Sequence, residues 1–314
     1  MSRTLLLTRS EYGLRMPSQL PPIVTVDWLV DELAQQHAPG AAATAHPRAA
    51  NLAIIHVGTT MTGRDPHQTY LDGHLPGARF VSLDDDLADP PAPIVGRHPL
   101  PAAASVHDLL ARFGIDADTR VVAYDDRNGA FAARLIWMLR VLDQPAALLD
   151  GDRDAWPDPL ATGPTPDTPV PSDRQHTDWP AGALADADTV AAHIETGGVV
   201  IDSREPARYR GEVEPIDAVA GHVPGAINLP FGDNLVDGRW RPASELATRF
   251  EALGDDPDAI VYCGSGVTAC HNALAIEAVG LPRPRIYVGS WSGWSSDPVR
   301  PIATGSTPRG AATK

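Results

Sequence analysis

The clearest chemical signal in the chain is a cysteine between an apolar run and a glycine-rich turn. The segment AIVYCGSGVTAC places Cys263 directly before Gly264 and Gly266. Glycines permit the positive φ angles with which a loop turns its amide N–H groups inward toward an anion. A helix predicted over Val267–Val279 adds unpaired N–H groups and the positive end of its dipole. Both effects favour a thiolate, so Cys263 is the candidate nucleophile.

Several chemistries use a thiolate in such a loop. Phosphoryl transfer needs an arginine six residues after the nucleophile, and position 269 is alanine. A cysteine protease needs a histidine base, but His271 is predicted on the following helix, pointing away from the loop. The remaining chemistry is attack of the thiolate on a sulfane sulfur, which converts the cysteine to a persulfide. Cys270 is interpreted as a packing residue, since seven helical residues place it ~10 Å from Cys263, too far for a disulfide.

The chain contains a diverged internal duplication. GHLPGARFVSLDDDL at Gly73–Leu87 matches GHVPGAINLPFGDNL at Gly221–Leu235, and VVAYDD matches IVYCGS in the same order. In the second match Asp125 stands where Cys263 stands. Because one copy lacks the cysteine, the packing of the fold does not require it, and a chemical role for Cys263 is favoured.

Short apolar runs alternate with helical patterns in both copies, which predicts an α/β fold. We expect two domains, each a five-stranded parallel sheet flanked by helices on both faces. The first, 23–156, is predicted to be non-catalytic and the second, 181–302, catalytic. The segment 157–180 holds seven prolines and is predicted to be an extended linker. The first copy also carries about ten extra residues within 88–101, a loop long enough to reach the other domain.

Composition excludes several classes of protein. The 314 residues carry a net charge of −15, which repels nucleic acid and anionic membrane surfaces. Two cysteines provide neither a disulfide framework nor a zinc-binding set, so no metal is expected. No apolar run has the length of a membrane span, and the N-terminal residues lack the apolar core of a signal peptide. We therefore expect a cytoplasmic protein with neither nucleic-acid nor membrane partners.

From about Ile23 to Pro301 the chain resembles the tandem-domain rhodanese sulfurtransferases. The resemblance rests on the paired GHxPGA elements, the YCGSGVTA loop, the RYRGEVEP segment after VVIDSREPA, and the terminal GSWSGW. It implies that Cys263 takes a sulfur atom from a small anionic donor and passes it, as a persulfide, to cyanide or a thiol. The resemblance implies no cofactor other than the sulfur atom bound to Cys263.

The resemblance also implies roles for individual residues. The loop CGSGVTA is similar to that of 3-mercaptopyruvate sulfurtransferases, with Ser265 in place of the lysine expected for thiosulfate. Arg208 corresponds to the arginine that binds the anionic end of the donor. Asp84 and His98 correspond to members of an Asp-His-Ser relay with Ser265. The loop residues expected to contact the donor are Gly264, Gly266, Val267 and Thr268.

Two departures from the family pattern bear on the donor. Ile216 occupies the position nearest to a second carboxylate-binding arginine, and Arg210, on a strand-like segment, is a candidate replacement. In the first copy, IIHVGTT replaces the acidic-x-arginine pattern that Asp202 and Arg204 retain. Two alternatives stay open: thiosulfate as the main donor, and a non-catalytic sulfur carrier or interaction module. The sequence does not indicate an oligomeric state or a physiological acceptor.

Overall fold

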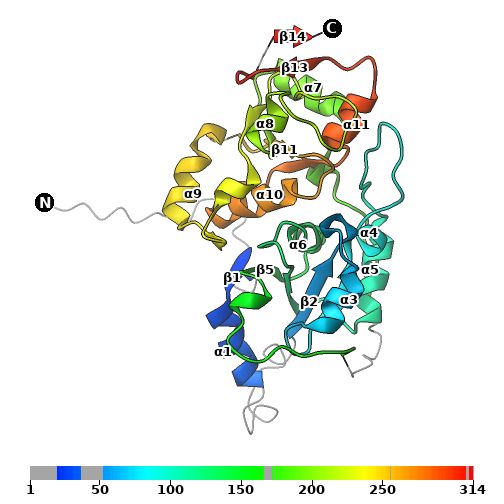
Figure 1. Cartoon of the computed structure of the whole chain (residues 1–314), viewed down its shortest axis with the longest axis vertical. Coiled ribbons are helices and arrows are strands. Elements are labelled where there is room, and N and C mark those ends of the chain that lie inside the picture. Colours follow the sequence, from blue (N-terminus) through cyan, green and yellow to red (C-terminus); the bar gives the residue numbers. More distant parts are fainter. Residues whose placement is uncertain are drawn as a thin grey trace, which may run out of the picture.

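The computed structural model describes residues 20–36, 52–165, 172, 174–254 and 256–308, and the backbone of 311–313. The N-terminal residues 1–19, examined for a targeting signal, lie outside these ranges, as do 166–171 and 173 of the expected linker. Two five-stranded parallel sheets, one in each half of the chain, dominate the structure (Figure 1). They confirm the predicted α/β class. In the described residues no helix is long and apolar enough to span a membrane.

The first half forms a sheet with strand order β1-β5-β4-β2-β3. Alternate residues of β2 face opposite sides: Ile55 and Val57 pack in one apolar cluster and Ile54 in another. Helices therefore cover both faces, as expected. The elements of this half are β1 (Ile23–Thr25), α1 (Val26–Gln36), β2 (Leu52–Gly58), α3 (Pro66–Asp72), β3 (Arg79–Ser82), α4 (Leu83–Asp86), α5 (Ala103–Arg112), β4 (Arg120–Tyr124), α6 (Ala132–Val141) and β5 (Ala146–Asp150), with short 3-10 turns at Thr60–Thr62 and Arg153–Ala155.

The second half repeats this topology with strand order β6-β12-β11-β7-β8. Val261 and Ile286 face one apolar cluster, while Ile260 and Tyr287 face the other. Its elements are β6 (Leu184–Ala185), α7 (Ala187–Glu195), β7 (Val200–Asp202), α8 (Pro206–Tyr209), β8 (Ile227–Asn228), β9 (Leu235–Val236), β10 (Arg239–Trp240), α9 (Ala243–Arg249), β11 (Ile260–Tyr262), α10 (Ala269–Ala278), β12 (Arg285–Tyr287), α11 (Ser290–Ser296), β13 (Ile302–Thr304) and β14 (Ala311–Thr313), with 3-10 turns at Ala181–Ala183, Phe231–Asn234 and Glu251–Leu253.

One prediction of local structure is wrong. The segment that carries Arg208 and Arg210 was expected to be strand-like, but its first part is helix α8. Pro206 occupies the first turn of that helix, where its fixed φ angle and missing N–H are tolerated. The helix carries Arg208, and Arg210 is its C-cap residue.

The two halves share one continuous apolar core. Helices α6 and α10 pack against each other between the sheets, and every residue of α6 is buried (Figure 1). The largest apolar cluster accordingly contains side chains of both helices, such as Leu135 and Leu274. This packing fixes the carboxyl ends of the second sheet, where Cys263 lies, relative to the loops of the first half.

Candidate active site

Cys263 lies directly after β11 and is 2% exposed. Its N–H donates to Ser290 Oγ at 3.2 Å, and its carbonyl accepts from Trp291 N–H at 3.0 Å. The carbonyl of Gly264 accepts from Ser292 N–H at 2.9 Å. The start of α11 therefore holds the backbone on both sides of the Cys263 side chain.

Gly266 is required by the path of this loop. Its φ angle is +77°, and a Cβ added there would lie 2.7 Å from the carbonyl oxygen of Val288. Its own carbonyl accepts from Arg134 Nη1 at 3.1 Å. Val267 and Thr268 complete the loop, and α10 begins at Ala269, two residues later than the sequence predicts.

The equivalent loop of the first half, which follows β4, binds a carboxylate through its backbone amides. The buried carboxylate of Asp125 accepts four backbone N–H groups. Burial raises the pKa of Asp125, and the four amide donors oppose that rise. The loop thus directs its amides at an acidic group in the position that Cys263 occupies in the second half. The four donors are Arg127 at 2.7 Å, Gly129 at 2.9 Å, Phe131 at 2.7 Å and Ala132 at 2.7 Å.

The loop 88–101 of the first half reaches α11 of the second. Ala92 and Gly96 exchange backbone hydrogen bonds, which closes a tight hairpin. Ile94 N–H donates to Ser296 Oγ at 2.9 Å, and Arg97 N–H donates to Ser292 Oγ at 3.1 Å. Figure 1 shows this hairpin in cyan beside α11. One helix, α11, therefore positions both the hairpin and the loop of Cys263.

His98 follows the hairpin and meets the Cys263 loop. A hydrogen bond of 2.8 Å joins His98 Nδ1 to Ser265 Oγ, and His98 Nε2 lies 3.9 Å from Asp84 Oδ1. Burial lowers the pKa of His98 to about 4, and the charges of Arg134 and Arg97 lower it further while Asp84 opposes them. The imidazole is therefore neutral near pH 7.

Asp84 is held in place by the turn after β2. Its carboxylate accepts from Thr60 N–H at 2.8 Å, from Thr60 Oγ1 at 3.0 Å and from Thr59 Oγ1 at 3.2 Å. The structure thus brings Asp84, His98 and Ser265 together from three separate segments.

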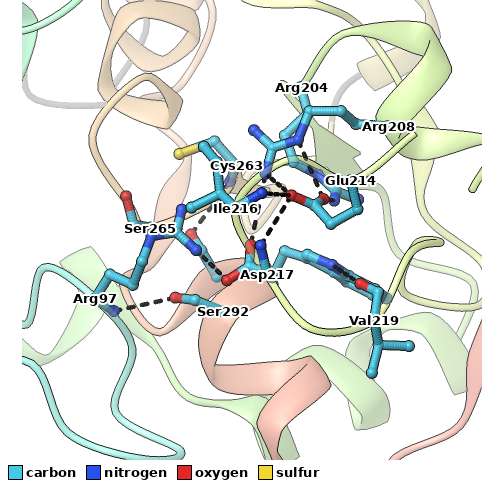
Figure 2. A network of polar contacts seen from close by, with 12 residues as sticks. Arg97, Arg204, Arg208, Glu214, Ile216, Asp217, Val219, Cys263, Ser265 and Ser292 are labelled. Carbon is cyan, nitrogen blue, oxygen red and sulfur yellow. Dashed lines mark hydrogen bonds and ion pairs between the residues drawn. The ribbon is translucent and has the colours of Figure 1, made fainter. Parts of the chain in front are cut away.

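Two guanidinium groups converge over Gly264. A Cβ added to Gly264 would lie 2.9 Å from Arg97 Nη2, 3.4 Å from Arg208 Nη2 and 3.5 Å from Arg208 Nη1. Arg97 Nη2 and Arg208 Nη1 donate to no residue in the described part of the chain. The other nitrogens are engaged: Arg208 donates to Glu214 from Nη2 at 2.7 Å and from Nε at 3.1 Å, and Arg97 Nη1 pairs with Asp217 (Figure 2).

Sequence reasoning missed Arg97 and Arg134. Arg97 carried no signal, because no pattern within the first half relates it to a site in the second. Arg134 is the one charged residue in the apolar run ARLIWML. That pattern indicates a buried guanidinium that needs several hydrogen-bond acceptors. It is fully buried, and besides Gly266 it donates to the carbonyls of Leu87, His98 and Pro99. Arg134 therefore links the loop of His98 to the loop of Cys263.

Neither Ile216 nor Arg210 supplies a second cation at Gly264. Ile216 is 57% exposed, and its N–H donates to Glu214 Oε1 at 3.1 Å. Arg210 does not replace the missing arginine, because its guanidinium donates twice to Glu212 on the surface. The second guanidinium at Gly264 comes instead from Arg97 of the other half.

Cys270 and His271 belong to the packing of α10, as predicted. Cys270 is buried, its Sγ donates to Gly266 O at 3.4 Å, and burial raises the pKa of its thiol to about 12. His271 stacks on Trp240 with ring centroids 4.1 Å apart, and Asn234 Nδ2 lies 3.1 Å from its Nδ1. Burial lowers the pKa of His271 to about 3.

A cavity of about 430 Å³ lies between the two halves. The second half contributes Arg208 and Thr268, and the first contributes Met61, Arg127 and Phe131 among others. Arg208 also lies over Gly264, and Thr268 belongs to the loop of Cys263, so the cavity adjoins that loop. Within the described ranges no group of three or more His, Cys, Asp or Glu residues is arranged to bind a metal ion.

Comparison with known proteins identifies relatives. Residues 186–297 match the model of the rhodanese-like domain. A probable 3-mercaptopyruvate sulfurtransferase of Pseudomonas aeruginosa is 47% identical, over 76% of this chain and 87% of that protein. A putative thiosulfate sulfurtransferase of Mycobacterium tuberculosis is 41% identical, over 81% and 92% respectively. The solved 3-mercaptopyruvate sulfurtransferase from Leishmania major superposes with a TM-score of 0.71 at 25% identity, covering 90% of this chain and 76% of that one.

Proposed function

The chain belongs to the rhodanese family of sulfurtransferases, and we propose that it transfers sulfur from 3-mercaptopyruvate to a thiol or cyanide through a persulfide on Cys263. The observation that carries this proposal is the set of groups around one buried thiol. A nucleophile, two free guanidinium N–H groups and a Ser-His pair meet at Gly264 and Ser265. In this assignment 181–302 is the catalytic domain, 23–156 the non-catalytic domain and 157–180 the linker.

The first step forms the persulfide. The Cys263 thiolate attacks the sulfur of mercaptopyruvate, so an S–S bond forms and the C–S bond breaks. The electron pair of the C–S bond enters the three-carbon fragment as the enolate of pyruvate. The proton of the donor thiol finally resides on that carbon, which releases pyruvate and leaves Cys263 as a persulfide anion. The amides of Gly264, Gly266, Val267 and Thr268 stabilise the sulfur anion.

The donor carboxylate binds between the two halves. Arg208 Nη1 and Arg97 Nη2 both face Gly264 and have hydrogen atoms to donate. A carboxylate accepts from two guanidinium groups in a charge-assisted geometry that fixes its orientation. Arg97 thereby supplies the second cation that the sequence lacks at Ile216.

Ser265 and His98 act on the donor carbonyl. As the C–S bond breaks, negative charge develops on the enolate oxygen, and a hydroxyl donor aimed at that oxygen stabilises it. Ser265 supplies the donor: the neutral His98 imidazole, protonated on Nδ1, donates to Ser265 Oγ across 2.8 Å and leaves the hydroxyl proton free for the enolate oxygen. Thiosulfate has no carbonyl, so this pair favours mercaptopyruvate. Asp84 lies 3.9 Å from Nε2, beyond hydrogen-bond distance, and acts on the imidazole through its charge.

The second step returns the thiolate. A thiol or cyanide entering through the cavity beside Arg208 attacks the outer sulfur, and the Cys263 thiolate leaves as the S–S bond breaks. No cofactor is required, since each nucleophile supplies the electron pair of its new bond to sulfur and the pair of the broken bond stays on the departing group. Thiosulfate as the main donor is the second candidate, supported by the name of the Mycobacterium tuberculosis relative and by the two free guanidinium N–H groups.

Steady-state kinetics tests the proposal. We would compare kcat/KM for 3-mercaptopyruvate and thiosulfate, with cyanide as acceptor, in the wild type, Cys263→Ser and Cys270→Ser. The proposal requires a preference for mercaptopyruvate, loss of turnover in Cys263→Ser and retention in Cys270→Ser. Ser265→Lys should move the preference toward thiosulfate. Turnover by Cys263→Ser would remove the persulfide from the mechanism, and a single discharge of sulfur without turnover would identify a carrier.

A further inference from the structure

Asp217, in the loop after α8, carries a carboxylate that both donor-facing arginines share. It pairs with Arg97 Nη1 through Oδ1, and its Oδ2 lies 3.5 Å from Arg208 Nη2. The Asp217 side chain is 8% exposed, so little water screens these contacts. Figure 2 shows Asp217 linked to both guanidinium groups beside Cys263.

The charges of the cluster balance without a donor. Three arginines meet three carboxylates: Arg204 pairs with Asp202 at 2.6 Å, Arg208 with Glu214 at 2.7 Å, and Arg97 with Asp217. The donor therefore meets a cluster whose own charges cancel. Among the described residues, the unpaired cation nearest to it is Arg134, which lies behind the Cys263 loop and donates only to backbone carbonyls. One anionic group can use the free nitrogens over Gly264. A second negative charge would face both Asp217 and the Cys263 thiolate without a further counter-charge in the cluster.

We propose that Asp217 determines which donor the site selects by its charge. The site favours a monoanionic 2-oxo carboxylate over a dianion such as thiosulfate. This inference rests on the proposed function of the same site. It adds a determinant that acts through net charge, independently of the Ser265–His98 pair. Removing the Asp217 carboxylate leaves one unpaired cation at the place where the donor anion binds.

Glu214 has a different role, although it lies in the same cluster. Its carboxylate binds Arg204 and Arg208 and also accepts the N–H groups of Ile216 and Asp217. Those contacts fix the fold of the loop that carries Asp217. Asp217 faces the two arginines whose remaining nitrogens point at Gly264, so its charge is the one that a bound donor meets.

The test compares Asp217→Asn with Glu212→Gln. Both changes remove one negative charge while keeping the size of the side chain, and Glu212 pairs with Arg210 on the surface of the same segment. The kcat/KM ratio of thiosulfate to mercaptopyruvate should rise about tenfold in Asp217→Asn, as expected for a unit charge a few ångströms away, and stay unchanged in Glu212→Gln. An unchanged ratio in Asp217→Asn, or an equal shift in both variants, would overturn the inference.

A binding measurement separates this inference from the proposed function. Methanesulfonate and sulfate are similar in shape but carry one and two negative charges, and calorimetry gives their affinities without turnover. The wild type should bind methanesulfonate at least as tightly as sulfate, and Asp217→Asn should reverse that order. Tighter sulfate binding by the wild type, the same order in both proteins, or no binding of either anion would contradict the role of Asp217. Failure of Cys263 to accept sulfur would instead contradict the proposed function.

Discussion

His98 and Ser265 lie 167 residues apart in the chain and meet through a hydrogen bond of 2.8 Å between Nδ1 and Oγ. The contact crosses from a loop of the first half to the loop of Cys263 in the second. The cysteine-free half therefore contributes directly to the site. The first-half loop holds the Asp125 carboxylate in the position of Cys263, while the loop 88–101 places His98 and Arg97 at the other loop.

The His98–Ser265 contact predicts a donor-specific defect. His98→Gln should lower kcat/KM for 3-mercaptopyruvate by about 10²-fold, the usual size of a lost proton-transfer or hydroxyl-orienting group. Turnover of thiosulfate should fall far less, because that donor presents no carbonyl to Ser265. Parallel assays of both donors measure the difference. An equal loss with both donors would show that His98 acts on the fold of the loop and not on the carbonyl.

Arg97 should contribute to donor binding. Arg97→Gln is expected to raise KM for mercaptopyruvate about tenfold or more, because it removes a charge-assisted hydrogen bond to the donor carboxylate. Arg210→Gln is the matched control, since that guanidinium pairs with Glu212 on the surface and should leave KM unchanged. A larger effect at Arg210 than at Arg97 would contradict the assignment.

The hairpin of the inserted loop should tolerate no Cβ at Gly96. This residue has a φ of +105°, and an added Cβ would lie 2.7 Å from the carbonyl oxygen of Gly289, so Gly96→Ala must displace Arg97 and His98. We expect kcat/KM to fall by up to about 10²-fold, the loss that a displacement of about an ångström can cause. Gly77→Ala is the control, since Gly77 has a φ of +78° and no neighbour within 4 Å of the added Cβ. That variant should lose about 1 kcal/mol of stability and keep its activity.

Stability should depend on pH through His271. Burial lowers the pKa of His271 to about 3, below its value of 6.5 in the unfolded chain, so the unfolded state binds more protons between these pH values. The contribution of neutral His271 to the free energy of unfolding is therefore fully present above pH 6.5 and is lost as the pH drops toward 3. Between pH 7 and pH 5 this residue alone should reduce the free energy of unfolding by about 2 kcal/mol. Denaturant titrations at both pH values should show a correspondingly smaller drop in His271→Gln, and an equal drop would refute the assignment.

Much of the fold follows from local patterns in the sequence. The alternation of apolar runs and helical segments predicts two parallel sheets, and the repeated motifs predict that the two halves share one fold. The loop of Cys263 is also predictable, because its chemistry depends on adjacent residues: a strand end, two glycines and a helix start. Segment 206–210 was misread because its alternating residue types suggest a strand, whereas Pro206 at the first turn favours a helix.

Contacts between the halves were predictable only in part. Family resemblance singled out Asp84 and His98, but no local pattern indicates that Arg97 lies over Gly264 or that Arg134 bridges two loops. These placements depend on the packing of α6 against α10 and of the hairpin on α11. Likewise, the sequence indicates a missing cation, because Ile216 stands where an arginine is expected. In the structure Arg97 of the first half lies over Gly264.

The most direct test is intact mass spectrometry of the reduced protein after incubation with 3-mercaptopyruvate or thiosulfate, with Cys263→Ser as the control. The account predicts that mercaptopyruvate adds the mass of one sulfur atom to the wild type and none to Cys263→Ser. Sulfur gained from thiosulfate alone would contradict the donor assignment. Sulfur gained by Cys263→Ser, or by neither protein, would contradict the claim that Cys263 carries the transferred atom.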